Sequence, residues 1–209
     1  MKIFLTDISN MDDNIMNKGL ELVTDYRRNK VEMCKFREDK ERSLAAGLLL
    51  NYATKMYAEY MKMQIKYEPV IDDVKVGIEC NVENNSKNNN GCDGKYNKEN
   101  NIEYKTDGNI IVNVRLDELV ENYDASYDYD IEYVANGKPV YRNSDIYFNL
   151  SHAGNYVVCA VSDKAVGVDI ERQRKNVIRV AKRFFTQAEC DWIGNDSLKF
   201  SRIWTLKEA

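Results

Sequence analysis

Apolar and polar residues follow two different periods along this chain, and the periods separate expected strands from expected helices. Alternation with a period of two predicts strands, whereas apolar residues spaced three to four apart predict helices. The expected strands are 2–8, 110–114, 131–134, 140–141, 146–150, 156–161 and 166–171. The expected helices are 12–28, 42–63, 177–184 and one opened by Thr186. This mixed order favours an α+β or α/β fold.

Two helix starts carry specific signals. Asp39 can cap the helix expected at 42–63, which places Arg42 in the first turn, where free N–H groups and the helix dipole favour an anion. Thr186 and Glu189 have the spacing of a capping box, in which each side chain accepts a hydrogen bond from the other residue's backbone.

Three other stretches read as turns or loops. Asn136 and Gly137 form a tight-turn signal, and residues 151–155 are expected to be the turn between two strands. Residues 81–101 are rich in Asn, Lys and Gly without a hydrophobic period, which predicts an exposed, disordered insertion.

Composition bounds the class of protein. The chain has 209 residues, of which 44% are hydrophobic and 31% charged, and its net charge of -4 gives no reason to expect a nucleic-acid partner. Asp7 comes too early for a signal peptide, and no apolar run is long enough to span a membrane, so we expect a cytoplasmic protein. We also expect a monomer. The five cysteines are scattered without a C-x-x-C pair, which predicts neither zinc nor a disulfide.

The candidate chemistry lies near the C-terminal end of the chain. In a strand, Asp169 and Glu171 project to one side while Val168 and Ile170 enter the core. Glu208 supplies a third carboxylate, and carboxylate oxygens beside a phosphate suit Mg²⁺. The alternative interpretation is a solvated strand end with an exposed helical glutamate.

Five blocks, in this order, carry a resemblance to a known family: Gly137 to Pro139, Phe148 to His152, Gly167 to Glu171, Phe184 with Phe185 and Glu189, and Trp204 to Ala209. With these blocks the chain resembles the 4′-phosphopantetheinyl transferases of the Sfp type over most of its length. The resemblance implies an α+β pseudo-dimer of two similar halves with the active site between them. The first half would be 1–163, containing the insertion 81–101, and the incomplete second half would be 164–209.

The resemblance also implies a reaction. A 4′-phosphopantetheine group would pass from coenzyme A to a serine of an acyl or peptidyl carrier protein, with Mg²⁺ held by Asp169, Glu171 and Glu208. Glu208 would otherwise be the base for the serine hydroxyl, and Lys207 would support the leaving phosphate. The residues implied for coenzyme A are Arg27, Lys30, Arg42, Lys138, Ser151 and His152.

Several alternatives stay open. His152 can be an ordinary turn residue, Lys138 an exposed hairpin lysine, and Glu189 can act in the capping box, near the catalytic site, or in both. The family pattern places a second lysine three residues beyond Ala209, so the chain is either a fragment or a shortened protein. The rival functions are an inactive coenzyme A-binding fragment and a Mg²⁺-dependent phosphodiesterase.

Overall fold

The computed structural model describes residues 1–64, 95–96, 102–106, 109–135, 137–172 and 177–209. The described strands form a six-stranded sheet in the order β2-β3-β4-β1-β8-β7 and a separate two-stranded sheet of β5 and β6. In the large sheet β1 and β4 are parallel, and the other neighbours are antiparallel. The strands are β1 (Lys2–Asp7), β2 (Lys95–Tyr96), β3 (Ile102–Thr106), β4 (Asn109–Asn113), β5 (Ile131–Tyr133), β6 (Pro139–Tyr141), β7 (Tyr147–Ala153) and β8 (Tyr156–Ser162).

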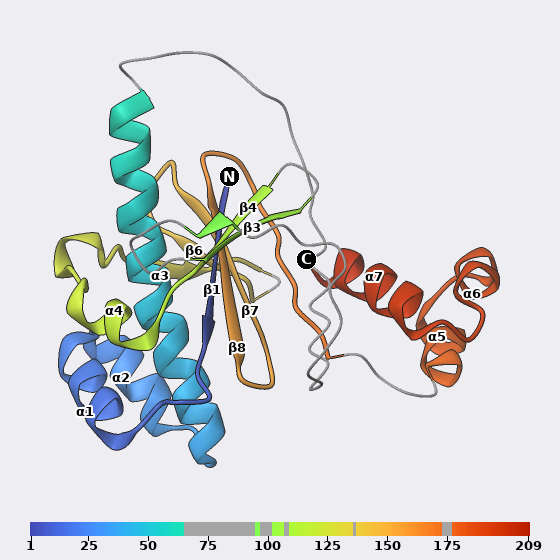
Figure 1. Cartoon of the computed structure of the whole chain (residues 1–209), viewed down its shortest axis with the longest axis horizontal. Coiled ribbons are helices and arrows are strands. Elements are labelled where there is room, and N and C mark those ends of the chain that lie inside the picture. The colour runs from blue at the N-terminus through green and yellow to red at the C-terminus, as the bar shows by residue number, and fades with distance from the viewer. Residues whose placement is uncertain (65–94, 97–101, 107–108, 136, 173–176) are drawn as a thin grey trace.

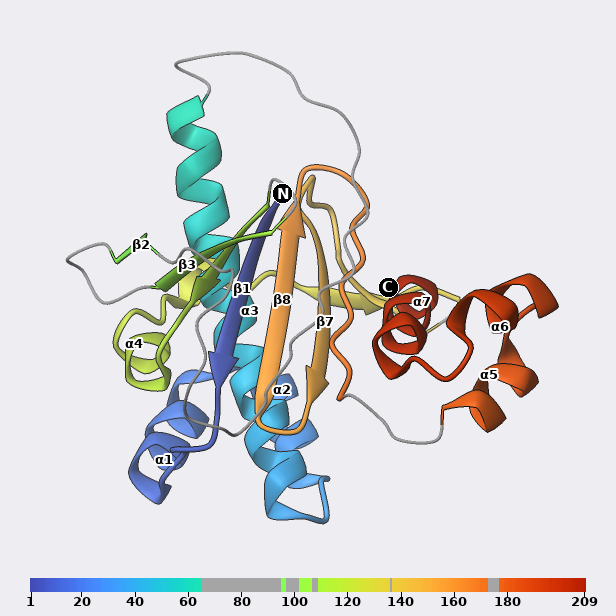
Figure 2. The ribbon, with the colours of Figure 1, turned by 45° about the vertical axis from the view of Figure 1, so that its right-hand side comes forward.

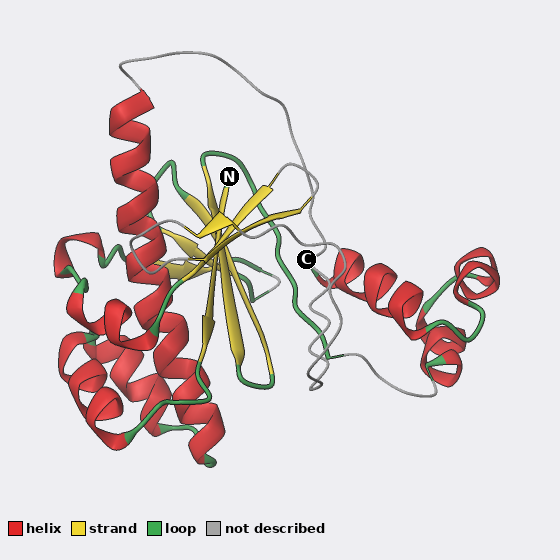
Figure 3. Cartoon of the chain, viewed as in Figure 1, coloured by secondary structure: helices red, strands yellow, loops and turns green. Residues whose placement is uncertain are grey.

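The two faces of the large sheet bury different sets of side chains. Figures 1 and 2 show the long helix α3 (Arg37–Gln64) lying against one face, where Phe4, Cys159 and Val161 join the larger core. Ile3 and Val158 point to the opposite face and join a second core. Because both faces are covered, β8 is buried along nearly its whole length. The expected α+β architecture is therefore confirmed (Figure 3).

The helix expected at 12–28 is wrong as a single element. It consists of α1 (Asp13–Leu22) and α2 (Asp25–Glu32), with Val23 in an extended conformation between them. The break follows from a cap, because the Thr24 side chain accepts the backbone N–H of Arg27 at 3.3 Å and so opens a new helix. A further short helix, α4 (Leu116–Glu121), and a 3₁₀ turn at Ala125–Tyr127 lie on the same side of the sheet as α1 and α3.

Helix α3 begins earlier than the sequence pattern suggested. It starts at Arg37, so Asp39 lies inside its first turn rather than capping it, and Arg42 falls in the second turn. The backbone N–H groups at the helix start therefore do not surround Arg42, and its first-turn placement was wrong. Arg42 instead pairs with Asp39 one turn earlier, at 2.5 Å.

The turn between β7 and β8 is also shorter than expected. Strand pairing continues through Ser151 and His152 to Ala153, which leaves only Gly154 and Asn155 in the turn. Gly154 has a φ of 59°, a left-handed conformation that favours glycine. Since side chains alternate along a strand, Ser151 and His152 point to opposite faces of the sheet. In the β5–β6 hairpin Gly137 also has a positive φ, of 80°, whereas Asn136 lies outside the described residues.

The strand expected at 166–171 is absent from the described secondary structure, although the expected alternation is present. Val166, Val168 and Ile170 are buried in the second core, and the intervening residues are not. The backbone N–H of Val168 donates to the Asn149 side chain at 2.7 Å, and that of Ile170 donates to Ser151 Oγ at 3.3 Å. The segment is therefore held over the sheet by side chains of β7, not by a strand ladder.

Among the described residues after 172 there are three helices: α5 (Ile178–Phe184), α6 (Gln187–Ile193) and α7 (Ser197–Glu208). They share a third core around Phe200 and Ile193, separate from the two that cover the sheet. The capping box of Thr186 and Glu189 is confirmed, with both reciprocal hydrogen bonds present.

The insertion at 81–101 falls mostly outside the described residues, but Lys95 and Tyr96 within it pair with β3 as strand β2. The described cysteines, Cys34, Cys159 and Cys190, are free thiols. Within the described parts of the chain, no helix combines the length and apolarity needed to cross a membrane.

Candidate functional site

Asp169 lies where the extended segment crosses β7. Ser151 Oγ donates to Asp169 Oδ1 at 2.6 Å, and the same hydroxyl accepts the backbone N–H of Ile170. One serine thus fixes both the carboxylate and the backbone that carries it. Lys138 holds the same segment from the β5–β6 hairpin, because its Nζ donates to the Val166 carbonyl at 3.1 Å.

The electrostatics of Asp169 reflect two further carboxylates. Burial raises the pKa of Asp169 above its ordinary value, and the negative charges of Glu171 and Glu208 raise it further. The hydrogen bond from Ser151 opposes this rise in pKa. Acids without a cation between them disfavour one another's ionisation, and a bound cation would relieve that repulsion. Glu208 reaches this region from the last turn of α7, while Glu171 Oε1 accepts the backbone N–H of Arg172 at 2.9 Å.

Hard oxygen donors of this kind fit Mg²⁺ in their chemistry. The three carboxylates lie farther apart than the ligands of a formed metal site. In the described ranges, no three His, Cys, Asp or Glu residues form a group able to hold a metal ion. The structure therefore brings Asp169, Glu171 and Glu208 into one electrostatic neighbourhood without closing a ligand shell around a metal.

Lys207 and Glu189 connect α7 to α6. Lys207 Nζ lies 3.0 Å from Glu189 Oε2 and 5.0 Å from the centre of the Phe185 ring. Glu189 keeps its place in the capping box at the same time, so its carboxylate serves the helix start and the ion pair together. Lys207 thus sits in a defined position, next to Glu208 in sequence.

Arg42 and His152 line a separate cleft of about 510 Å³ on the α3 side of the sheet. Arg42 Nη1 donates to the Gly154 carbonyl at 3.3 Å, which ties α3 to the β7–β8 hairpin. Partial burial and the nearby Arg42 guanidinium lower the pKa of His152, whereas Asp39 and Asp169 raise it. The neutral imidazole is therefore favoured near neutral pH, with the capacity to donate one hydrogen bond and accept another.

Sequence reasoning missed Arg172, which lines the same cleft. A Cβ atom on Gly154 would lie 2.0 Å from Arg172 Nη2, so the guanidinium rests directly against the glycine of the hairpin turn. No sequence signal places the two together, because eighteen positions separate them and Arg172 belongs to no motif. The only hint was its place immediately after Glu171.

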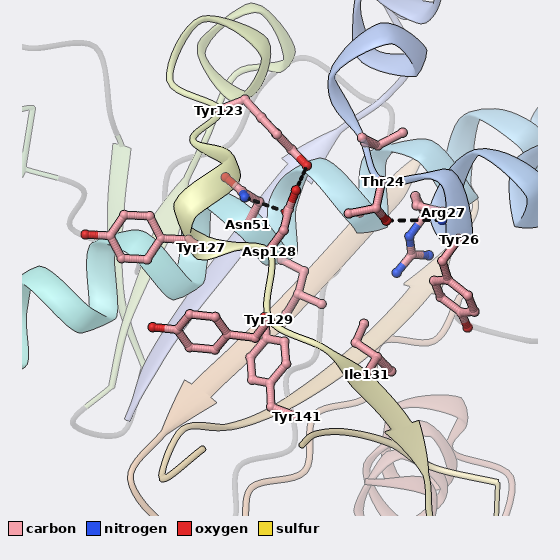
Figure 4. Close-up of a pocket in the computed structure, with 13 residues that line it drawn as sticks. Thr24, Tyr26, Arg27, Asn51, Tyr123, Tyr127, Asp128, Tyr129, Ile131 and Tyr141 are labelled. Carbon is pink, nitrogen blue, oxygen red and sulfur yellow. Dashed lines mark hydrogen bonds between the residues drawn. The ribbon is translucent and has the colours of Figure 1, made fainter. Parts of the chain in front are cut away.

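Arg27 and Lys30 lie elsewhere, on α2. Arg27 is only 8% exposed and packs against Gly47 of α3, and its Nη1 donates to the Ser43 carbonyl at 3.4 Å. It borders a small cavity of about 40 Å³ lined by tyrosines and Asp128, into which Figure 4 shows its guanidinium pointing. Lys30 donates to the Tyr133 hydroxyl at 3.4 Å. The structure does not bring these two residues to the cleft of Arg42 and His152.

Comparison with known proteins bears on residues 165–209, which match a model of the 4′-phosphopantetheinyl transferase superfamily. The 4′-phosphopantetheinyl transferase gsp of Aneurinibacillus migulanus is 40% identical over 78 residues, covering 35% of this chain and 32% of that protein. The 4′-phosphopantetheinyl transferase Sfp of Bacillus subtilis (strain 168) is 35% identical over 79 residues, covering 35% of each. HetI of Nostoc sp., also a 4′-phosphopantetheinyl transferase, is 37% identical over 90 residues, or 37% of this chain and 38% of that protein.

These comparisons confirm the resemblance to the Sfp-type family over 35% to 37% of this chain, and they do not test the rest of it. The matched segment contains Asp169, Glu171, Lys207 and Glu208. The chain spans between 32% and 38% of the length of these three relatives.

Proposed function

Starting from the match of residues 165–209 to the 4′-phosphopantetheinyl transferase superfamily, we propose that this chain takes part in transferring 4′-phosphopantetheine from coenzyme A to a carrier-protein serine. The observation that supports this most is the position of Asp169, which Ser151 holds at 2.6 Å and whose pKa is raised by burial and by the charges of Glu171 and Glu208. A pseudo-dimer with halves divided near residues 163 and 164, a monomeric state and a cytoplasmic location are parts of the same proposal.

The carboxylates would bind the metal ion and accept the proton at the reacting phosphate. Asp169, Glu171 and Glu208 would hold Mg²⁺, which when bound neutralises charge on a pyrophosphate. Ser151 keeps Asp169 in place through its 2.6 Å hydrogen bond. The carrier serine hydroxyl attacks the β-phosphorus of coenzyme A, and its proton passes to Glu208 if Asp169 and Glu171 alone hold the metal, or to solvent if Glu208 is the third ligand. The bond from that phosphorus to the bridging oxygen breaks, and adenosine 3′,5′-bisphosphate leaves, with Lys207 nearby to balance its charge.

The cleft supplies a place for the rest of coenzyme A. Arg42 and His152 carry donors suited to phosphate oxygens, and Lys138 and Ser151 lie at the segment that carries Asp169. Ser151 would have to share its hydroxyl between Asp169 and the substrate. Arg27 and Lys30 remain assigned to coenzyme A only by resemblance, since Arg27 lies beside a different cavity and Lys30 bonds to Tyr133.

The test is a transfer assay followed by mass spectrometry. The chain is incubated with coenzyme A, Mg²⁺ and purified apo acyl and peptidyl carrier proteins, and a mass gain of one phosphopantetheine group is expected on a carrier. Asp169→Ala should reduce that gain about a hundredfold or more, because charge stabilisation by a metal ion contributes several kcal/mol.

Asp145→Ala serves as the control, because Asp145 is an exposed acid outside the site, and it should transfer at the rate of the unaltered chain. Circular dichroism establishes that the variants are folded. Absence of transfer to every carrier, or equal transfer by Asp169→Ala at low Mg²⁺, would overturn the proposal.

A further inference from the structure

Two guanidinium groups meet at one glycine. Arg42 Nη1 donates to the Gly154 carbonyl, and Arg172 lies against the Cα of the same residue. The two arginines come from α3 and from the segment after Glu171, and both line the cleft that also contains His152. The β7–β8 hairpin turn therefore contacts two guanidinium groups, one from α3 and one from the residue after Glu171.

Arg172 differs from Arg42 in how it is held. Arg42 is engaged by Asp39 and by the Gly154 carbonyl, whereas within the described residues the Arg172 side chain has no hydrogen-bond or ion-pair partner. Its backbone N–H, not its guanidinium, bonds to Glu171. Packing against a glycine orients the planar group and leaves its N–H donors available.

The dimensions and rim of the cleft indicate the size of its ligand. A volume of about 510 Å³ exceeds what a bare phosphate needs and falls in the range of small-molecule sites. Phe36, which is 66% exposed, lines the cleft and offers apolar surface to a flat organic group. Two guanidinium groups beside an imidazole suit a dianion with several acceptor oxygens, because such bonds are charge-assisted and multidentate.

We propose that Arg172 is an anion-binding residue of this cleft and that, opposite Arg42 across Gly154, it recognises a phosphate monoester on an organic ligand. This inference rests on the proposed function for the identity of that ligand, coenzyme A. Arg172 then distinguishes ligands that carry a phosphate monoester from those that lack one. Glu38 and Asp39 are the acids that line the cleft, and Asp39 is paired with Arg42. Glu38 would compete with the ligand's phosphate for Arg172, because an ion pair between Glu38 and Arg172 would occupy the guanidinium.

The experiment is calorimetric titration of the chain with adenosine 3′,5′-bisphosphate and with adenosine, at low and at raised salt. Arg172→Gln should weaken the bisphosphate about tenfold to a hundredfold, which is the usual effect of losing a hydrogen-bonding charge, and leave adenosine unchanged. The salt dependence of bisphosphate binding should also become shallower. Arg202→Gln, an exposed arginine of α7 outside the cleft, is the matched control and should bind as the unaltered chain does.

Equal bisphosphate affinity in Arg172→Gln and the unaltered chain would overturn the inference, and so would an unaltered chain that does not bind the bisphosphate. Carrier modification is measured on the same preparations, which separates the two proposals. Transfer with no effect of Arg172→Gln on binding would leave the proposed function standing without this inference. Loss of bisphosphate affinity in a chain that shows no transfer would leave the inference standing without the proposed function.

Discussion

His152 is the residue whose protonation the cleft controls most directly. Burial and the positive charge of Arg42 lower its pKa, and the negative charges of Asp39 and Asp169 oppose this only in part. The pKa of His152 in the folded chain is therefore below the 6.5 of a free imidazole. Its contribution to stability is complete above pH 6.5 and declines as the pH falls through 6.5 toward the lower folded pKa.

We accordingly predict that His152→Gln lowers the acid sensitivity of the fold. Melting temperatures measured from about pH 7.5 to about pH 5 should fall less steeply in the variant than in the unaltered chain, because glutamine does not titrate. The effect should be small, since the ring is partly exposed. Parallel curves for the two proteins would show that His152 has the same pKa folded and unfolded.

Single functional residues can be recognised from sequence where they belong to a pattern of neighbouring positions. Asp169 and Glu171 were recognisable because two positions on an alternating segment share a side, and the burial of Val168 and Ile170 agrees with that. Arg172 was not recognisable, because its role depends on Gly154, a residue distant in sequence. The deep burial of Arg27 was equally hidden, since arginine is mostly a surface residue.

At the scale of elements, the end of α7 rests on the segment that carries Asp169. A Cβ atom on Gly167 would lie 2.0 Å from the Ala209 carbonyl oxygen, so only glycine permits this close approach. The contact joins the residue that follows Glu208 to the segment that carries Asp169.

Gly167→Ala should therefore push the end of α7 away from the segment. We expect a loss of about 1–3 kcal/mol, the usual cost of overpacking, together with weaker carrier modification. Thermal unfolding and the mass assay measure the two effects. Gly194→Ala is the comparison, because it has open space around its Cβ position and tests only the strain of its φ of 53°. Unchanged stability and transfer in Gly167→Ala would show that α7 and the segment that carries Asp169 can move apart without cost.

Sequence predicted elements well where the cause of their structure is local. The capping box of Thr186 and the continuous apolar run of β8 depend on neighbours a few positions away, and both elements are present. Prediction failed where a distant contact decides. Residues 166–171 have a strand pattern, but their backbone bonds to Asn149 and Ser151 side chains rather than to another backbone. The split at Thr24 was signalled by a cap residue inside an otherwise continuous helical pattern.

At the scale of the whole molecule, charge is unevenly distributed. The chain carries a net charge of -4, yet α5 exposes three basic residues, Arg179, Lys182 and Arg183. Helix α5 follows residues 166–171, the segment that carries Asp169, and precedes α6 and α7. A basic surface of this kind would attract an acidic partner by long-range steering.

We predict that reversing Arg179 and Lys182 to glutamate raises the KM for an acidic carrier protein about tenfold at low salt, because steering acts mainly on encounter. The KM for coenzyme A should stay nearly the same, and added salt should shrink the difference. Steady-state kinetics with each substrate varied in turn provide the measurement. An equal rise in both KM values would point instead to damage of the fold or of the nucleotide cleft.

The attachment of residues 166–171 to β7 also affects which part of the fold can separate first. Two amide hydrogens, those of Val168 and Ile170, are bonded to the side chains of Asn149 and Ser151. Breaking these contacts leaves every backbone bond between β7 and β8 intact, so the segment can separate without unfolding the sheet. Separation also removes Val166, Val168 and Ile170 from the second core, and we expect these residues to open together with Asp169 before the strands beneath them unfold.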